Sequence, residues 1–165
     1  MDAVDQLCPN CGLCCDGTLF ADVELRTGDD AKQLAKLGLA LKRKEPSKTA
    51  FTQPCGCFDG RLCTIYADRP KRCWLFECGL LKKVRAGEMK ASAALKKIAG
   101  AKAHVKRVGD LLKSSGADER MALSERYART MSEPMDLASG NADGHGKLLR
   151  TYEDLMKVLQ RDFLQ

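Results

Sequence analysis

Four of the nine cysteines of this 165-residue chain lie in the stretch 8–15, which reads CPNCGLCC. The other five lie between Cys55 and Cys78, and no cysteine follows Cys78. Disulfide frameworks usually spread cysteines along the whole chain, and adjacent cysteines bridge poorly to each other. Two dense groups that can meet in space are typical of metal sites with thiolate ligands. The cysteines therefore predict a metal-binding protein.

The spacing of the first four cysteines leaves the number of metal centres open. Cys8 and Cys11 enclose a proline and precede a glycine, as in the turns of zinc ribbons and rubredoxin-type iron sites. Cys14 and Cys15 are adjacent, so their side chains diverge. Either one of them is a bystander, or the two serve different metal centres. Eight thiolates could therefore form one polynuclear centre or two four-thiolate sites, holding zinc or iron.

The composition is that of a soluble globular protein, with 44% hydrophobic and 30% charged residues. We expect one domain over residues 1–165, with a cysteine region at 8–78 and a helical region at 79–165. No apolar run follows Met1, and none approaches the roughly 18–20 residues that a membrane span needs. We therefore expect a cytoplasmic protein with reduced thiols and no membrane contact.

The cysteine region up to residue 66 is expected to contain short strands and one helix. Apolar alternation predicts a strand at 18–25, and a capping aspartate at 29 or 30 predicts a helix to Leu37. A polar loop is expected at 42–48. The chain should then be extended at 49–57 and return as a strand at 61–66, after a hairpin signal at Asp59-Gly60.

The last two cysteines are expected near a short helix. Asp68 and Pro70 predict its start. Cys73 would lie near the helix N-terminus, where the helix dipole and nearby cations favour a thiolate. Cys73 and Cys78 could share a metal if this helix ends near Gly79. We also expect the two cysteine segments to pack together, with sulfurs from both converging on the metal.

The second half of the chain predicts helices. Residues 80–112 indicate one long helix, or two that meet near Gly87 or Gly100. Asp118 is expected to cap a helix to Met131, with Met121, Ala128 and Met131 on its inner face. A glycine-rich loop at 132–146 and a last helix at 147–163 should follow. Three to four helices on a small metal-stapled β-hairpin and knuckle give an α+β, mostly α, domain. The apolar stripe of 80–112 comprises Ala94, Ile98, Ala101, Val105, Val108 and Leu112.

The two cysteine segments carry a family resemblance. The motif CxxCxxCC at 8–15, followed by CTIYxxRPxxCxxFxC at 63–78, resembles the bacterial cysteine-cluster family named for the first motif. That family is described as a zinc- or iron-chelating domain, and flagellin lysine N-methylases contain a similar cluster. In two places the chain departs from the pattern, since Cys57 has no counterpart and Trp74 stands where the family usually has arginine. The resemblance covers residues 8–78 and implies zinc or iron, including a [4Fe–4S] cluster, bound by Cys8, Cys11, Cys14, Cys15, Cys55, Cys63, Cys73 and Cys78.

The residues predict metal binding more directly than any reaction, so whether the protein is an enzyme is left open. Closed zinc sites favour a structural or adaptor role. An iron–sulfur cluster favours redox chemistry, and the resemblance extends this to an enzyme or accessory protein in protein methylation. His104 and His145 fit no catalytic spacing and are expected at the surface.

A third hypothesis is a zinc-knuckle protein that binds nucleic acid. Residues 82–113 hold ten lysines and arginines against two acids. The cations surround a predicted helix, which favours weak, salt-sensitive binding to polyanions over recognition of a sequence. An aromatic content of 5% offers few rings for stacking on bases. The sequence leaves the identity of any protein partner open.

Overall fold

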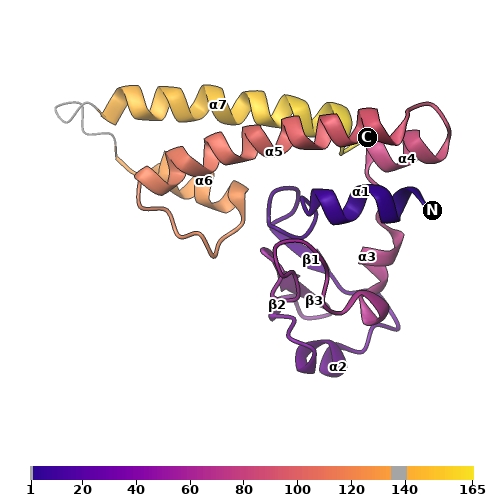
Figure 1. Ribbon diagram of the computed structural model, residues 1–165. Helices are drawn as coiled ribbons and strands as arrows, with labels where there is room; N and C mark the ends of the chain where they lie inside the picture. Colours follow the sequence, from indigo (N-terminus) through magenta and orange to yellow (C-terminus); the bar gives the residue numbers. More distant parts are fainter. Residues whose placement is uncertain (1, 135–140) are drawn as a thin grey trace.

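The computed structural model describes residues 2–134 and 141–165. These residues form seven α-helices, one 3-10 helix and a three-stranded antiparallel sheet, which confirms an α+β, mostly α, fold with more helices than expected. In Figure 1, α5 (Ala91–Ser114) and α7 (Asn141–Asp162) run side by side. Helix α1 (Ala3–Cys11) lies beneath α5, and the sheet lies on the far side of α1.

The helical part is built around the apolar stripe of α5. Five of the six expected stripe residues are buried, and Val105 is partly buried against the same core. Helix α7 contributes its own apolar face, and the stacked rings of Tyr127 and Tyr152, 3.7 Å apart, join α6 (Leu123–Ser132) to it. The buried apolar residues described in α7 and in the turn that follows it are Leu148, Leu155, Leu159 and Phe163.

Helix α7 begins earlier than expected. Residues 141–146, which we predicted as loop, are helical, whereas the part of that predicted loop at 135–140 lies outside the described residues. The apolar periodicity that starts at Leu148 holds the helix against α5. An exposed glycine costs a helix only about 1 kcal/mol relative to alanine, so Gly144 does not end it.

Glycine also separates α4 (Gly79–Arg85) from α5. Gly87 has a φ of 74°, in the left-handed region that glycine adopts without the strain that a side chain would bring. The break therefore falls at Gly87. Gly100, the alternative position, lies inside α5.

Helix α6 begins at Leu123, later than expected. The carboxylate of Asp118 accepts a hydrogen bond from the backbone N–H of Arg120 and pairs with its guanidinium, so Asp118 closes a turn and caps no helix. The Leu123 N–H donates to the Gly17 carbonyl at 2.9 Å, which ties α6 to the cysteine region. Leu123 and Thr130 are buried, whereas Ala128, expected on the inner face, is exposed.

The sheet lies at 22–52, with the order β1 (Asp22–Glu24), β3 (Lys48–Thr52), β2 (Leu41–Glu45). The predicted polar loop at 42–48 is therefore wrong, because most of it belongs to β2 and β3. Lys42 and Lys44 on β2 reach the Asp22 carboxylate of β1, at 3.1 and 3.0 Å, and this cross-sheet pairing is invisible in the local sequence. The predicted strand at 18–25 is confirmed only at 22–24.

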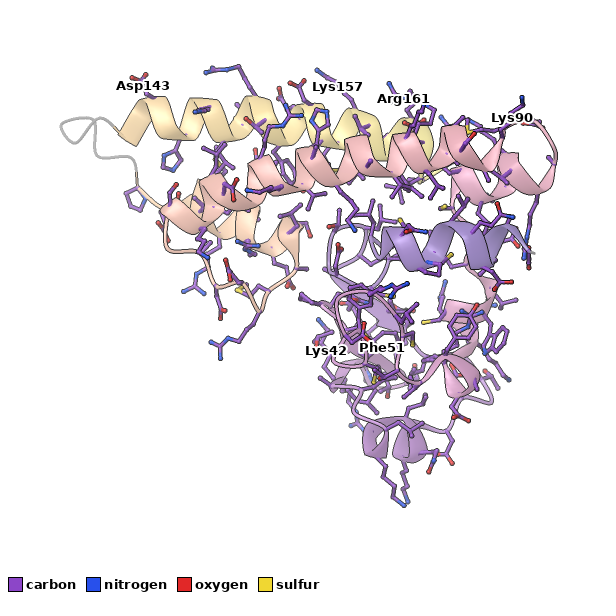
Figure 2. All side chains as sticks on the ribbon, in the orientation of Figure 1. Lys42, Phe51, Lys90, Asp143, Lys157 and Arg161 are labelled. Carbon is purple, nitrogen blue, oxygen red and sulfur yellow. The ribbon has the colours of Figure 1, made fainter. Side chains whose placement is uncertain are left out.

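A second, smaller core lies between the sheet and α2 (Ala31–Lys36). Phe51 on β3, labelled in Figure 2, is fully buried and is paired in register with Val23 and Leu41. Helix α2 begins as expected, since the Asp30 carboxylate accepts a hydrogen bond from the Gln33 N–H. The buried residues of this core are Leu34, Leu39, Phe51, Cys57 and Ile65.

No helix of the described residues is long and apolar enough to cross a membrane.

Candidate metal centre

The first two cysteines lie on the final turns of α1, which corrects the predicted knuckle. Leu7 is buried in the main core and anchors the helix next to Cys8. Cys8 and Cys11 are three apart on this helix, so their side chains lie on the same face. The helix ends at Gly12, whose φ of 77° is the left-handed conformation of a glycine cap.

The chain then turns sharply through Cys14 and Cys15. The neighbouring Leu13 is fully buried, which anchors the turn in the main core. The Cys14 and Cys15 sulfurs lie 3.7 Å apart, so the two adjacent thiols are in contact and the expected divergence of their side chains is wrong.

The second cysteine segment is attached directly to the first. The backbone N–H of Cys55 donates to the carbonyl of Cys15 at 2.8 Å. Cys63 lies opposite Phe58 in an isolated β-bridge, and the Phe58 ring covers Gly12. The two segments therefore pack together as expected.

The predicted hairpin strand at 61–66 is wrong. The Asp59 carboxylate accepts hydrogen bonds from the backbone N–H groups of Arg61 and Leu62, at 2.8 and 2.6 Å. These bonds close a tight turn, and the chain continues into the 3-10 helix η1 (Tyr66–Asp68). Cys63 is therefore held by a turn and a single bridge.

Cys73 and Cys78 lie on separate helices. Cys73 is in α3 (Lys71–Leu75), which starts after Pro70 as expected but ends before Cys78. Cys78 is the N-cap residue of α4. The condition that we set for a shared metal, one helix running to Gly79, is not met.

The electrostatic contacts among the thiols divide eight cysteines into two sets of four. The thiols of Cys14 and Cys78 both interact electrostatically with those of Cys8 and Cys11. The Cys15 thiol interacts with those of Cys55 and Cys73, and the Cys73 thiol interacts with those of Cys55 and Cys63. The sets adjoin at the Cys14–Cys15 contact, and Cys14 also acts on Cys73. We call Cys8, Cys11, Cys14 and Cys78 the helix-side set, and Cys15, Cys55, Cys63 and Cys73 the sheet-side set.

The packing supports the same division. Cys11 and Cys78 pack against the main core of the helical part. Cys55, Cys63 and Cys73 pack against the second core beside the sheet. Each set therefore lies at the edge of a different hydrophobic core, with the Cys14–Cys15 turn between them.

Burial keeps most of these thiols protonated in the metal-free protein. It raises the pKa of Cys11 and of Cys73 to about 12. The pKa of Cys8 and of Cys55 rises to about 11 for the same reason, although Cys8 still reaches solvent. The expected thiolate at Cys73 is therefore wrong for the metal-free chain, because burial outweighs the effect of Arg69.

Cys14 differs from the other thiols. The hydrogen bond from the Cys15 thiol lowers the pKa of Cys14 and raises that of Cys15. Arg69 lowers the pKa of Cys14 further. Cys14 is therefore the thiol of the pair that ionises first.

Cys57 is a core residue beside the sheet-side set, since its thiol interacts with those of Cys55 and Cys63. Its side chain is almost fully buried in the second core, and its thiol donates to the Leu37 carbonyl at 3.3 Å. The absence of a counterpart for Cys57 in the family motif agrees with this role. The two histidines, expected at the surface, are both partly buried on helices: His104 is on α5, and His145 on α7 contacts the Thr130 carbonyl at 3.2 Å.

The sulfurs of each set are neighbours, but they do not surround a common metal position. Within residues 2–134 and 141–165, no three cysteine, histidine, aspartate or glutamate side chains converge tightly enough to hold one ion. The expectation that sulfurs from both segments already converge is therefore not met.

A family model described as "Putative zinc- or iron-chelating domain", and named CxxCxxCC, matches residues 7–96, more than half of the chain. The chain belongs to the CxxCxxCC family. The family region extends past Cys78 through α4 and into α5, beyond the 8–78 of the motif resemblance. A search of curated proteins found no match, and a search of solved structures found none.

The donor chemistry of this CxxCxxCC chain fits its family description. Each set offers four thiols, and four thiolates are a complete tetrahedral shell for zinc or the full ligand set of a [4Fe–4S] cluster. A bound cation favours the thiolate form that burial opposes. The family description and the donor set therefore agree on zinc or iron chelation, and ligands in this chain are proposed below.

Proposed function

We propose that this protein binds two metal centres, one in the helix-side set and one in the sheet-side set, and that the metals stabilise the fold of residues 8–78. Each centre has four cysteine ligands. The observation that carries the proposal is the Cys14–Cys15 turn, where two thiols 3.7 Å apart have different partners.

The further partners of the adjacent cysteines favour two centres. The Cys14 and Cys15 sulfurs are in contact, but most of the other thiols that interact electrostatically with each of them differ. Cys14 is electrostatically linked to two cysteines of α1, and Cys15 is hydrogen-bonded through its backbone to Cys55. A tetrahedral ion takes four sulfurs at about 2.3 Å, so eight thiols exceed what one ion can hold.

The metals would compensate for sparse secondary structure in the cysteine region. Between β3 and α3 the chain forms one 3-10 helix, one isolated bridge and turns. The second core is small, with five buried residues. Structural zinc contributes roughly 10–16 kcal/mol of apparent binding free energy, comparable to or above the 5–15 kcal/mol stability of a typical domain. The thiols must stay reduced for this role, as they do in the cytoplasm.

The test is metal stoichiometry after purification under anaerobic, reducing conditions. The wild-type protein should carry two zinc ions, or two clusters. Cys78→Ser should lose the helix-side metal and Cys63→Ser the sheet-side metal, each keeping about half of the total. Complete loss of metal from both variants, while their helix content is unchanged, would indicate one polynuclear centre and overturn the assignment.

The same preparation decides between a structural and a redox role. A broad absorption band near about 400 nm indicates iron–sulfur charge transfer, whereas zinc sites are colourless. The contact between Cys14 and Cys15 is the observation that favours a redox role as the second candidate, because it would place two clusters side by side. Two such neighbouring clusters could exchange electrons, and reduction by dithionite should then bleach both.

A further inference from the structure

Arg69 is held between two aromatic rings beside the cysteine sets. Its guanidinium carbon lies 3.9 Å from the centroid of the Tyr66 ring and 4.0 Å from that of the Trp74 ring. The rings lie on η1 and α3, with their centroids 6.1 Å apart. Because a guanidinium stacks on aromatic faces, this arrangement fixes the position of the charge.

The charge of Arg69 reaches both cysteine sets. It interacts electrostatically with the thiols of Cys8 and Cys14 in the helix-side set and of Cys73 in the sheet-side set. Its Nε is buried and has no hydrogen-bond partner among the residues that the structure describes. A buried N–H donor without a partner is costly, so an acceptor that appears on metal binding would stabilise it.

Two filled sites need a compensating cation. Four thiolates around a divalent ion leave a net charge of about −2 per site. The sites would be neighbours, since the Cys14 and Cys15 sulfurs are in contact. Like charges at short range in a partly buried place repel, so the first filled site would oppose the filling of the second.

We propose that Arg69 is the charge-compensating residue of the two metal sites, and that it allows both to be filled at once by placing its charge beside them and donating Nε–H to a thiolate. This inference rests on the two-site assignment proposed above. The proposed role distinguishes Arg69 from the neighbouring cations at the surface. Arg72 is such a cation, since its side chain is exposed and lies 3.9 Å from the Glu24 carboxylate.

The test is a zinc titration of the reduced, metal-free, full-length protein against a competing chelator. The wild-type chain should bind two ions with similar affinity. In Arg69→Gln, the affinity for the first ion should change little and that for the second should fall by about tenfold or more. Arg69→Lys keeps the charge but loses Nε–H and the planar stack. Its affinity for the second ion should lie between those of the wild type and of Arg69→Gln. Arg72→Gln removes the same charge from the surface and should bind like the wild type.

Trp74 provides a second readout, because it is the only tryptophan of the chain. Its emission should change in Arg69→Gln, where the ring loses its guanidinium, and stay unchanged in Arg72→Gln. Should Arg69→Gln fail to fold, Arg69→Lys decides: weaker binding of the second ion supports the proposal, and wild-type affinity for both ions overturns it. Equal second-ion affinities in Arg69→Gln and Arg72→Gln also overturn it. A wild-type protein that binds fewer than two ions instead defeats the two-site assignment, and this inference with it.

Discussion

Phe58 packs directly over Gly12, where the two cysteine segments meet. A Cβ on residue 12 would lie 2.6 Å from the Cζ atom of the Phe58 ring. Gly12 also has a φ of 77°, which L side chains rarely adopt. The end of α1 therefore needs glycine for two reasons, its backbone conformation and the space that the ring occupies.

We predict that Gly12→Ala destabilises the protein by roughly 2–4 kcal/mol, from left-handed strain together with overpacking against Phe58. Gly87→Ala is the matched control, since Gly87 has a φ of 74° but no described atom within 4 Å of an added Cβ. It should cost only about 1–2 kcal/mol. Denaturant unfolding of both variants measures the difference, and equal losses would mean that the Phe58 contact contributes nothing.

Cys11 and Cys57 should respond oppositely to the same substitution. Cys11→Ser should release the helix-side metal, because it removes one of four ligands. Cys57→Ser should retain the full metal content and cost about 1 kcal/mol, since a serine hydroxyl can still donate to the Leu37 carbonyl. Metal analysis of the two purified variants checks this. Equal metal loss from both would place Cys57 among the ligands.

Metal affinity should rise with pH. The pKa of Cys11 and Cys73 is about 12 and that of Cys8 and Cys55 about 11, so these groups carry protons at neutral pH and must release them on binding. Protons therefore compete with the metal, and affinity falls as the pH falls. Calorimetric titration with zinc in two buffers of different ionisation enthalpy counts the released protons. Affinity that stays constant between about pH 6 and 8 would contradict the protonated state assigned to these thiols.

Binding to polyanions should be weak and salt-sensitive. Three of the lysines between 82 and 113 pair with the protein's own carboxylates, Lys97 with Asp162, Lys106 with Asp110 and Lys113 with Glu119. We therefore expect binding to heparin at low ionic strength that disappears near physiological salt. The prediction fails if the protein binds one particular nucleic-acid sequence tightly at physiological salt.

Exposed cations of α5 test the same prediction by substitution. Replacing Lys96 and Arg107 by glutamine should reduce the dependence of log affinity on log salt by about 1–2. Lys157→Gln on α7 is a control, because that lysine already pairs with Asp154 at 3.2 Å. Heparin affinity measured over a salt series distinguishes the variants.

The helical part of the fold could be predicted because its signals are local. The spacing of apolar residues along α5 matches the helical repeat, and the residues concerned are buried as expected. The elements of the cysteine region were predicted less well. Strand β2 was missed because its lysines read as a polar loop, and their partner Asp22 lies about twenty residues earlier in the chain.

The sequence by itself determined that the chain belongs with thiolate metal proteins, since side-chain chemistry and the spacing of cysteines are local properties. Only the tertiary structure decided that Cys14 and Cys15 face different partners, that Cys73 and Cys78 belong to different sets, and that Cys57 is a core residue. The reason is physical: a thiol's partners depend on which distant backbone segments pack together, as at the hydrogen bond between Cys55 and Cys15. The same packing buries the thiols and sets their pKa, which overrode the thiolate that sequence proximity predicted at Cys73.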